Sequence, residues 1–360
     1  MKLCRVFSFF LITAVLAMVS CKERPVGPEP ETFDKEAMLL QIGGSVIQPA
    51  YADWKAKTEA LRTAYVGFDV EKSEENFLNL REKFLAAYEA WQACSVFELG
   101  PAADQNLRLL MNTFPTDTAQ MEANLASGSY DLGAAANSDA RGFPAIDYLL
   151  FGRGNSAETA ADLSSAANFS LRYLDDNIQI MFNGANVVSE DWNDYLTEFK
   201  TNTASSVGSP ISVLVNEINF EFELFKNARI GIPLGKKTLG VTQVAKLEAY
   251  YSDDSKTMAL ANLSGIKSAF TGGTGLGLDD YLDAIDAQYN GQKLSEAIID
   301  GFEKIETELA NVSSLRTAIE SNPSSLEPTY HAIEQLVVLL KTDLPSQLGV
   351  QITYQDNDGD

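Results

Sequence analysis

The chain has 360 residues, of which 45% are hydrophobic and 21% charged, and its formal net charge is -23 at pH 7. So acidic a surface repels the phosphate backbone, which excludes nucleic acid as a partner. Of the three cysteines, the two nearest the N-terminus fall within or at the end of a predicted export signal. Only Cys94 remains in the body of the chain, so the fold has to rest on its hydrophobic core without an internal disulfide.

The N-terminus has the anatomy of a bacterial export signal. A short basic start precedes an apolar run over residues 6–19, which ends at Cys21. The run is too short to span a bilayer, and a small residue before a cysteine is where lipoprotein signal peptidase cuts. We therefore predict that residues 1–20 are removed, that Cys21 carries acyl chains, and that the proline-containing residues 21–32 form a tether. Secretion without a lipid is the alternative, because Met18 stands where leucine is commonest.

Apolar residues recur every three or four positions almost throughout the chain, which is typical of helices packed on a core. The clearest apolar face consists of Phe77, Leu80, Phe84, Tyr88 and Trp91. No stretch alternates as a strand does. Further helices are expected over residues 34–66 with a break near Pro49, 105–111, 143–150, 162–183, 191–200, 211–226, 241–261, 263–270, 279–289, 294–309, 312–321 and 328–343. The glycine-rich residues 271–277 are expected to form a loop rather than a phosphate cradle, because they follow a helix and lack a lysine.

Two short segments resemble each other. Residues 143–147 and 330–334 both read aromatic, any residue, alanine, isoleucine and acid, and both continue with apolar residues. Duplication of a helical bundle is the simplest cause. We therefore predict an all-α fold of two duplicated helical-bundle halves packed together. The polar residues 201–210 are the expected boundary, so that the halves cover residues 33–205 and 206–360.

Several separated blocks resemble the imelysin-like family, which includes iron-regulated protein A and imelysin peptidase-like lipoproteins. They are RGFPAIDYLLFG at 141–152, AYEAWQACSVFELGPA at 87–102, NTFPTD at 112–117, ARIGIPLG at 228–235 and LKTDLPSQLGV at 340–350. The resemblance covers roughly residues 33–360. It implies an all-helical fold of two related halves with the family signature near their interface. It also implies an exported bacterial protein, often a lipoprotein, that is linked to iron acquisition and was early classified as a metallopeptidase.

The chain departs from the family signature, Gly-x-His-x-x-Glu. Gly142 is kept, but Pro144 stands at the histidine position and Asp147 at the glutamate position. A histidine and a carboxylate three residues apart lie on one helix face and can converge on a cation, whereas proline cannot bind a metal. Pro144 is well suited to the first turn of a helix, where its missing N–H costs nothing. The resemblance thus implies a binding region at Arg141, Gly142, Pro144 and Asp147.

Two residues around this region leave alternatives open. Arg141 is expected either to bind an anion or to pair with a neighbouring carboxylate, Asp139 or Glu158. The only histidine, His331, opens an H-x-x-E sequence that ends at Glu334 in the second half.

If the equivalent helices face each other, Asp147, His331 and Glu334 could converge and restore a metal site. The alternative is that His331 is a hydrogen-bonded structural residue. No H-E-x-x-H sequence and no nucleophile paired with a histidine is present, so peptidase catalysis is not expected.

Two acidic segments carry weaker signals. The chain ends in DNDGD at 356–360, which resembles the opening of a calcium loop without the later ligands, so a solvated acidic tail is expected. The aromatic and acidic residues 250–254 are interpreted as a solvated helix end rather than an iron site.

Three functions fit the sequence. The preferred one is a non-catalytic binding protein for iron, haem or another ligand; the others are a scaffold or interaction lipoprotein without metal, and a metallopeptidase. Iron is expected as a cofactor only through the family resemblance. The expected location is the cell envelope, as an outer-membrane lipoprotein facing the periplasm or the surface. Its expected partners are the membrane, through Cys21, and an outer-membrane transporter.

Overall fold

The computed structural model describes residues 33–165 and 169–354. The described part is built of helices and their connections. Its only paired strands are β1 (Gln288–Tyr289) and β2 (Gln292–Lys293), each two residues long, which form one antiparallel hairpin. The all-α prediction is confirmed. The chain from Asp34 onward belongs to one compact unit, and the proposed duplication with its boundary near residue 205 stays a prediction. None of the described helices is long and apolar enough to cross a membrane.

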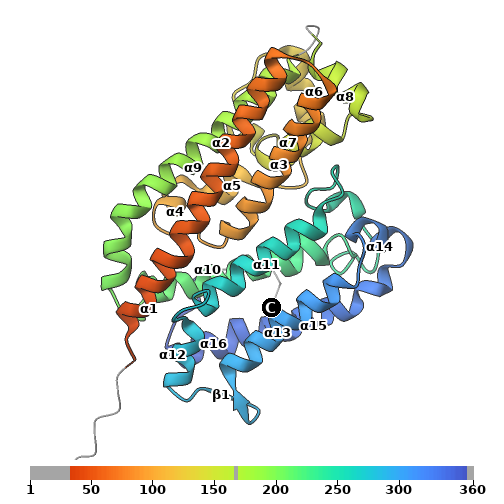
Figure 1. Cartoon of the computed structure of the whole chain (residues 1–360). Helices are drawn as coiled ribbons and strands as arrows, with labels where there is room; N and C mark the ends of the chain where they lie inside the picture. The colour runs from red at the N-terminus through yellow and green to blue at the C-terminus, as the bar shows by residue number, and fades with distance from the viewer. Residues whose placement is uncertain (1–32, 166–168, 355–360) are drawn as a thin grey trace, which may run out of the picture. The chain divides into compact units, whose positions relative to one another are not determined.

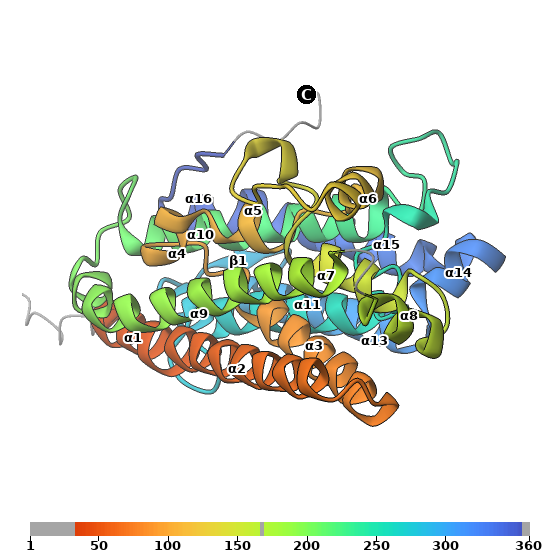
Figure 2. The ribbon, with the colours of Figure 1, turned by 90° about the horizontal axis from the view of Figure 1, so that it is seen from above.

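The first part of the chain is organised by three long helices, α2, α3 and α9, of which α3 and α9 both pack on α2 (Figures 1 and 2). The helical elements of this part are α1 (Lys35–Gln41), the π-helical turn η1 (Ile42–Ile47), α2 (Gln48–Val70), α3 (Glu74–Cys94), α4 (Pro101–Gln105), α5 (Leu107–Met111), α6 (Thr118–Ser127), the short 3-10 turn η2 (Ala135–Asn137), α7 (Gly142–Phe151), α8 (Ser156–Leu163) and α9 (Ser170–Thr201).

The second part is built around α11, which packs against α3, α10 and α13, while α13 packs against α15 (Figure 1). Its helical elements are α10 (Pro210–Leu224), the π-helical turn η3 (Phe225–Gly231), the 3-10 turn η4 (Val244–Lys246), α11 (Ser255–Thr271), α12 (Leu278–Ala284), α13 (Leu294–Ala310), α14 (Leu315–Ser321), the 3-10 turn η5 (Pro323–Leu326), α15 (Glu327–Val338), the π-helical turn η6 (Leu339–Asp343) and α16 (Leu344–Leu348).

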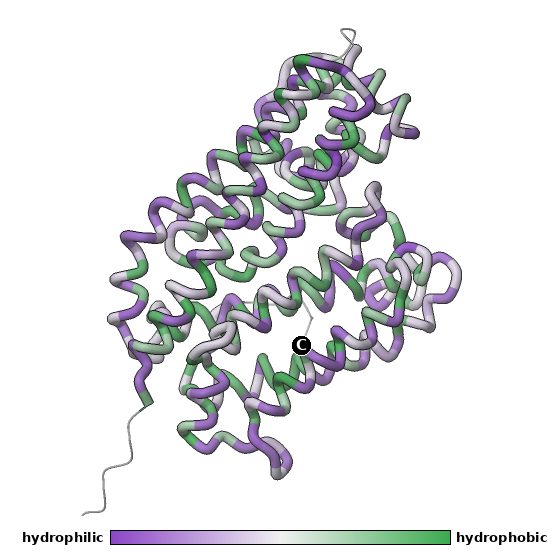
Figure 3. The backbone as a smooth tube through the Cα atoms, in the orientation of Figure 1, coloured by the Kyte–Doolittle hydropathy of each residue, from purple (hydrophilic) through white to green (hydrophobic). Residues whose placement is uncertain are grey.

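The helices bury one face each, as their apolar spacing predicts. Hydrophobic and hydrophilic stretches alternate along every long helix in Figure 3. All three tryptophans are buried, and the rings of Trp54 and Trp91 lie 4.8 Å apart between α2 and α3. The predicted apolar face of α3 is buried along its whole length. Burial of such large aromatic side chains supplies much of the stability of this first part.

The predicted break near Pro49 is wrong, because the chain stays helical from Lys35 to Val70. The π-helical turn η1 ends two residues before the proline, and the Gln48 N–H that follows it bonds to the Gly43 carbonyl, five residues back. Proline clashes with the carbonyl four residues earlier in a regular helix. A widened turn gives the ring space, so the helix continues.

The predicted helix over residues 241–261 is also wrong in its first half. After η4 the chain makes turns until Asp254, with Ala249 and Asp253 in the left-handed region at φ of 48° and 61°. Long-range contacts of this segment, described below, outweigh its helical apolar spacing. Other differences are smaller: α9 is continuous where two helices were expected, α6 was not predicted, and the end of the helix predicted over 279–289 is part of the hairpin.

Helices α3 and α11 are in close backbone contact at Gly265. A Cβ atom built on this glycine would lie 2.4 Å from the backbone oxygen of Ala93. No side chain fits there without moving one helix backbone away from the other. The contact between these two helices therefore depends on glycine.

We expect Gly265→Ala to lower the free energy of unfolding by about 1–3 kcal/mol, because it overpacks a helix contact made by backbone. Gly67→Ala in α2 is the matched control, since nothing lies within 4 Å of its added Cβ, and it should raise stability by about 0.5–1 kcal/mol. Urea unfolding followed by circular dichroism measures both. Equal stability of the two variants would contradict the close contact.

Candidate functional site

The signature segment is held in place at the start of α7. Gly142 has φ of 79°, and a Cβ there would lie 2.2 Å from the Met111 carbonyl oxygen. Its N–H donates to Oδ1 of Asn177 over 2.8 Å. Pro144 lies in the first turn, where a backbone N–H has no helical partner, as predicted. The glycine is required by the close backbone approach, and the proline fits the helix start.

Asp147 lies one turn further along α7 and is only 1% exposed. Its two carboxylate oxygens accept the backbone N–H groups of Tyr251 at 2.9 Å and Ser252 at 3.1 Å. Burial raises the pKa of Asp147 to about 6, although hydrogen bonds from Ser252 and Tyr251 oppose the shift. The carboxylate therefore holds the turn at residues 251–252 and has both oxygens engaged.

The space around Pro144 and Asp147 is almost filled. The two residues share a cavity of about 20 Å³ with apolar and aromatic neighbours, among them Phe114, Leu247 and Tyr251. Such a volume holds about one water molecule. At the position of the family signature, the chain thus packs side chains against each other.

Arg141 is buried beside this cavity but does not line it. Its Nη1 donates to the Leu132 carbonyl over 2.5 Å, and its Nε has no hydrogen-bond partner. Burial lowers the pKa of this guanidinium. Among the described residues it forms no ion pair with Asp139 or Glu158. Glu158 instead caps the start of α8 together with Asn155.

The predicted metal site is not assembled. His331 and Glu334 lie on the exposed face of α15, with their side chains 70% and 54% exposed and 3.9 Å between Nδ1 and Oε2, whereas Asp147 is buried. The opposite face of α15 carries the buried Tyr330 and Ile333. No group of three His, Cys, Asp or Glu side chains in the described part of the chain could hold a metal ion.

The acidic segment 250–254 contacts α14 instead of lying free. Asp253 accepts a hydrogen bond from the Ser314 hydroxyl over 2.7 Å, and the Arg316 guanidinium lies over the Tyr250 ring at 4.2 Å. Cys21 and the acidic residues 356–360 lie outside the described residues.

A buried charge network joins both parts of the chain around Arg229. Its Nε donates to Glu248 over 2.8 Å, and its Nη2 lies 3.1 Å from Oε1 of Glu221. Both glutamates are 2% exposed or less. Burial alone would raise the pKa of Glu221, but Arg229 and Arg108 outweigh it and hold the pKa below its ordinary value.

Neutral side chains complete this network. Glu248 accepts hydrogen bonds from Gln92, Tyr88 and Asn112, all of them buried. Because Glu248 lies in the turn segment after η4, these bonds pull that segment into the interior. They explain why residues 241–254 do not form the predicted helix.

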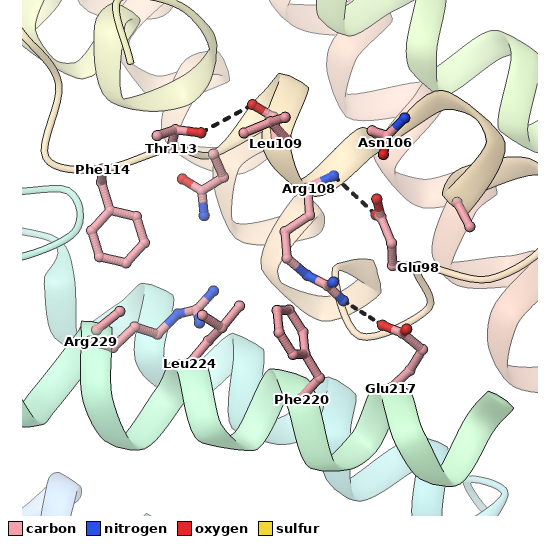
Figure 4. A pocket seen from close by; sticks show the side chains of 13 residues that line it. Glu98, Asn106, Arg108, Leu109, Thr113, Phe114, Glu217, Phe220, Leu224 and Arg229 are labelled. Carbon is pink, nitrogen blue, oxygen red and sulfur yellow. Dashed lines mark hydrogen bonds and ion pairs between the residues drawn. The ribbon is translucent and has the colours of Figure 1, made fainter. Parts of the chain in front are cut away.

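An open pocket of about 510 Å³ lies on the solvent side of this network, between α5 and α10 (Figure 4). Its apolar wall includes Leu109, Phe114, Phe220 and Leu224. Its charged residues are Glu98, Arg108, Glu217 and Arg229. The pocket therefore combines aromatic surface with both signs of charge, as small-molecule sites do.

Arg108 connects the acidic groups of the pocket. Its Nη2 lies 2.8 Å from Oε2 of Glu217, and its Nε lies 2.9 Å from Oε2 of Glu221. Its backbone N–H donates to Glu98 over 3.0 Å. Burial raises the pKa of Glu98 to about 7, and Arg108 reduces this shift only in part. Burial likewise raises the pKa of Glu217.

The sequence carries signals for these residues. Glu98 and Arg229 fall inside two of the blocks that resemble the family, and Glu217 and Glu221 are acidic residues four apart within the apolar run of α10. A carboxylate on an otherwise apolar helix face indicates a buried partner of opposite charge. Only the fold shows that Arg108 and Arg229 are those partners.

The fold and the remnant of the signature define an all-α protein of the imelysin type. The imelysin family model matches residues 47–342, so the chain belongs to the imelysin family. No curated protein matches the chain significantly.

Two solved structures share the fold. An imelysin-like protein from Psychrobacter arcticum is 17% identical with a TM-score of 0.69, and a protein described as an iron-regulated protein A precursor from Parabacteroides distasonis is 18% identical with a TM-score of 0.73. Each comparison covers 89% of this chain and 97% of the other.

Asp147 should make stability depend on pH in a defined way. Its pKa of about 6 lies above the ordinary value of 3.8. The fold therefore favours the protonated form, whose contribution is fully present below pH 3.8 and is lost as the pH rises through about 6. The stability of the wild type minus that of Asp147→Asn should fall by about 3 kcal/mol between about pH 4 and 7.

Urea unfolding at several pH values measures this difference. Asp191→Asn removes an exposed carboxylate from α9 and serves as the control. A flat difference for Asp147→Asn would show that its carboxylate is not held as described.

Proposed function

We propose that the protein is a non-catalytic binding protein of the bacterial envelope that takes its ligand in the open pocket between α5 and α10. The pocket itself carries this proposal. Its volume of about 510 Å³ suits a small molecule, whereas the cavity at the signature measures about 20 Å³. Binding at the open pocket needs none of the residues that the signature has lost.

A non-catalytic role is supported by where the chain places the side chains that hydrolysis would need. A metallopeptidase requires a metal-activated water and an acid or base beside it. Pro144 replaces the signature histidine, and the one histidine of the chain is on the surface of α15. Cys94 is buried, and burial raises the pKa of its thiol well above the ordinary value, which disfavours the nucleophilic thiolate.

A role in iron acquisition is supported by the relative from Parabacteroides distasonis, which is described as iron-regulated. We extend this role to the present chain, with chelated iron(III) or haem as the ligand and an outer-membrane transporter as the partner. The word precursor in the description of the same relative, together with the N-terminal sequence ending at Cys21, supports an exported and lipid-anchored protein.

A scaffold without a ligand is the second candidate. The filled cavity at Pro144 and Asp147 favours it, because the position that defines the family is closed by apolar and aromatic side chains. In that case the charges of the open pocket would serve stability alone.

Binding can be tested by closing the pocket. Ala103 is an exposed residue of α4 that lines it, so Ala103→Trp should fill the entrance at little cost in stability. With the full chain purified in detergent, titrations with iron(III) citrate and with haem should reveal one bound ligand per chain. Ala103→Trp should weaken that binding about tenfold, a change of about 1.4 kcal/mol.

Ala56→Trp, on the exposed surface of α2, is the matched control and should bind as the wild type does. If neither iron(III) nor haem binds, the link to iron is wrong. If binding occurs and Ala103→Trp leaves it unchanged, the site is elsewhere.

The anchor can be tested by fractionation. We expect the wild type, expressed in a bacterial host, to sediment with the membranes and to be released only by detergent. Cys21→Ser should appear in the soluble fraction or remain uncleaved, because no thiol is left to carry acyl chains. Cys94→Ser, which alters a buried cysteine, should fractionate as the wild type. Identical fractionation of Cys21→Ser would contradict a lipid anchor.

A further inference from the structure

The charges around the open pocket do not balance. Arg108 is shared by Glu217 and Glu221, and Arg229 is shared by Glu221 and Glu248. Two guanidinium groups thus face three carboxylates, and Glu98 adds a fourth that receives only the Arg108 backbone N–H. The network as a whole therefore has more carboxylates than guanidinium groups, whereas the charged side chains that line the pocket are two carboxylates, Glu98 and Glu217, and the two arginines.

Glu98 has a free position for a donor. Only one of its oxygens, Oε2, accepts a hydrogen bond from the described residues. Burial raises its pKa to about 7, and the nearby Arg108 offsets this shift only in part. A positively charged group beside Glu98 would supply the missing partner.

The inner end of the pocket instead requires a hydrogen-bond acceptor from the ligand. Arg229 is 4% exposed, and its Nη1 has no hydrogen-bond partner while Nε and Nη2 are bonded to the network. Arg229 lines the pocket, and its guanidinium carbon lies 5.9 Å from the centre of the Phe114 ring (Figure 4). An unpaired buried donor favours a ligand that brings an acceptor oxygen.

The wall between these two ends is apolar. Phe114, Phe220 and Leu224 line it, and the Arg108 guanidinium already lies over the Phe220 ring at 4.9 Å. The surface that remains suits the body of a hydrophobic or aromatic molecule. A bare metal ion would leave this wall unused, and the described residues hold no group of three ligands for one.

We propose that this pocket binds a small organic molecule with a protonated amine at Glu98, a carbonyl oxygen toward Nη1 of Arg229, and an apolar body against Phe114 and Phe220. The inference rests on the proposed function only in using the same pocket. It requires neither iron nor haem, so the two can fail separately. The Glu98 carboxylate disfavours an anionic group at its own end of the pocket.

Matched small molecules test this ligand class without any mutation. The probe is 4-(2-aminoethyl)benzamide, which carries an ammonium group, an aromatic ring and an amide carbonyl. With the full chain in detergent at pH 8, calorimetry should detect its binding to a single site at submillimolar concentration. 4-Ethylbenzamide lacks the ammonium and phenethylamine lacks the carbonyl, and each should bind at least about tenfold more weakly. Equal binding of 4-ethylbenzamide, or no binding of the probe up to millimolar concentration, would overturn the proposal.

A variant of Glu98 tests where the ammonium group binds. Glu98→Gln keeps an acceptor for the Arg108 N–H but loses the charge, so it should weaken the probe about tenfold or more. Glu82→Gln is the control, since that side chain is 70% exposed on α3, and it should leave the affinity unchanged. An unaltered affinity of Glu98→Gln would refute the assigned position.

Ala103→Trp separates the two proposals. If it blocks iron(III) or haem while the probe never binds, the pocket is functional and the ligand class is wrong. If the probe binds and neither iron(III) nor haem does, the ligand class stands and the link to iron fails.

Discussion

The buried guanidinium of Arg229 is the interaction on which the rest of the site depends. It joins Glu221 of α10 to Glu248 of the turn segment, and Gln92 of α3 accepts from the same Nη2. A charge buried to this degree is tolerated only when its partners are in place, and removing one partner of such a pair costs about 3–5 kcal/mol. Three segments far apart in the sequence are thereby fixed relative to one another.

This buried charge network explains the role of the carboxylate in the altered signature. Glu248 pairs with Arg229 from a segment that is not helical, residues 247–254, in which Ala249 and Asp253 adopt the left-handed conformation. That conformation is unfavourable for residues other than glycine. Asp147 offsets part of this cost by accepting the N–H groups of Tyr251 and Ser252. A carboxylate at the signature position is thus retained for a structural purpose that needs no histidine beside it.

Much of the fold could be predicted because amphipathic spacing is local, as the buried face of α3 illustrates. The failures come from long-range contacts. Nothing near residues 241–254 reveals that Glu248 pairs with Arg229. The metal-site alternative for His331 failed for a different reason, since the neighbouring Tyr330 and Ile333 already mark the buried face of α15 and place His331 and Glu334 outside it. The open pocket was missed because Glu98, Arg108 and Glu217 come from three separate segments.

The closed and the open cavity are neighbours that share Phe114, and this explains how the protein can lose one and keep the other. On one side of the ring, Pro144 and Asp147 pack against the turn segment. On the other side, Arg229 and Asn112 line the open pocket, and both also bond to Glu248. Closing the signature cavity fixes the turn segment, which fixes Glu248 and so orients Arg229. The loss of the signature histidine is therefore compatible with a rigid, charged pocket next to it, and filling the first cavity stabilises the wall of the second.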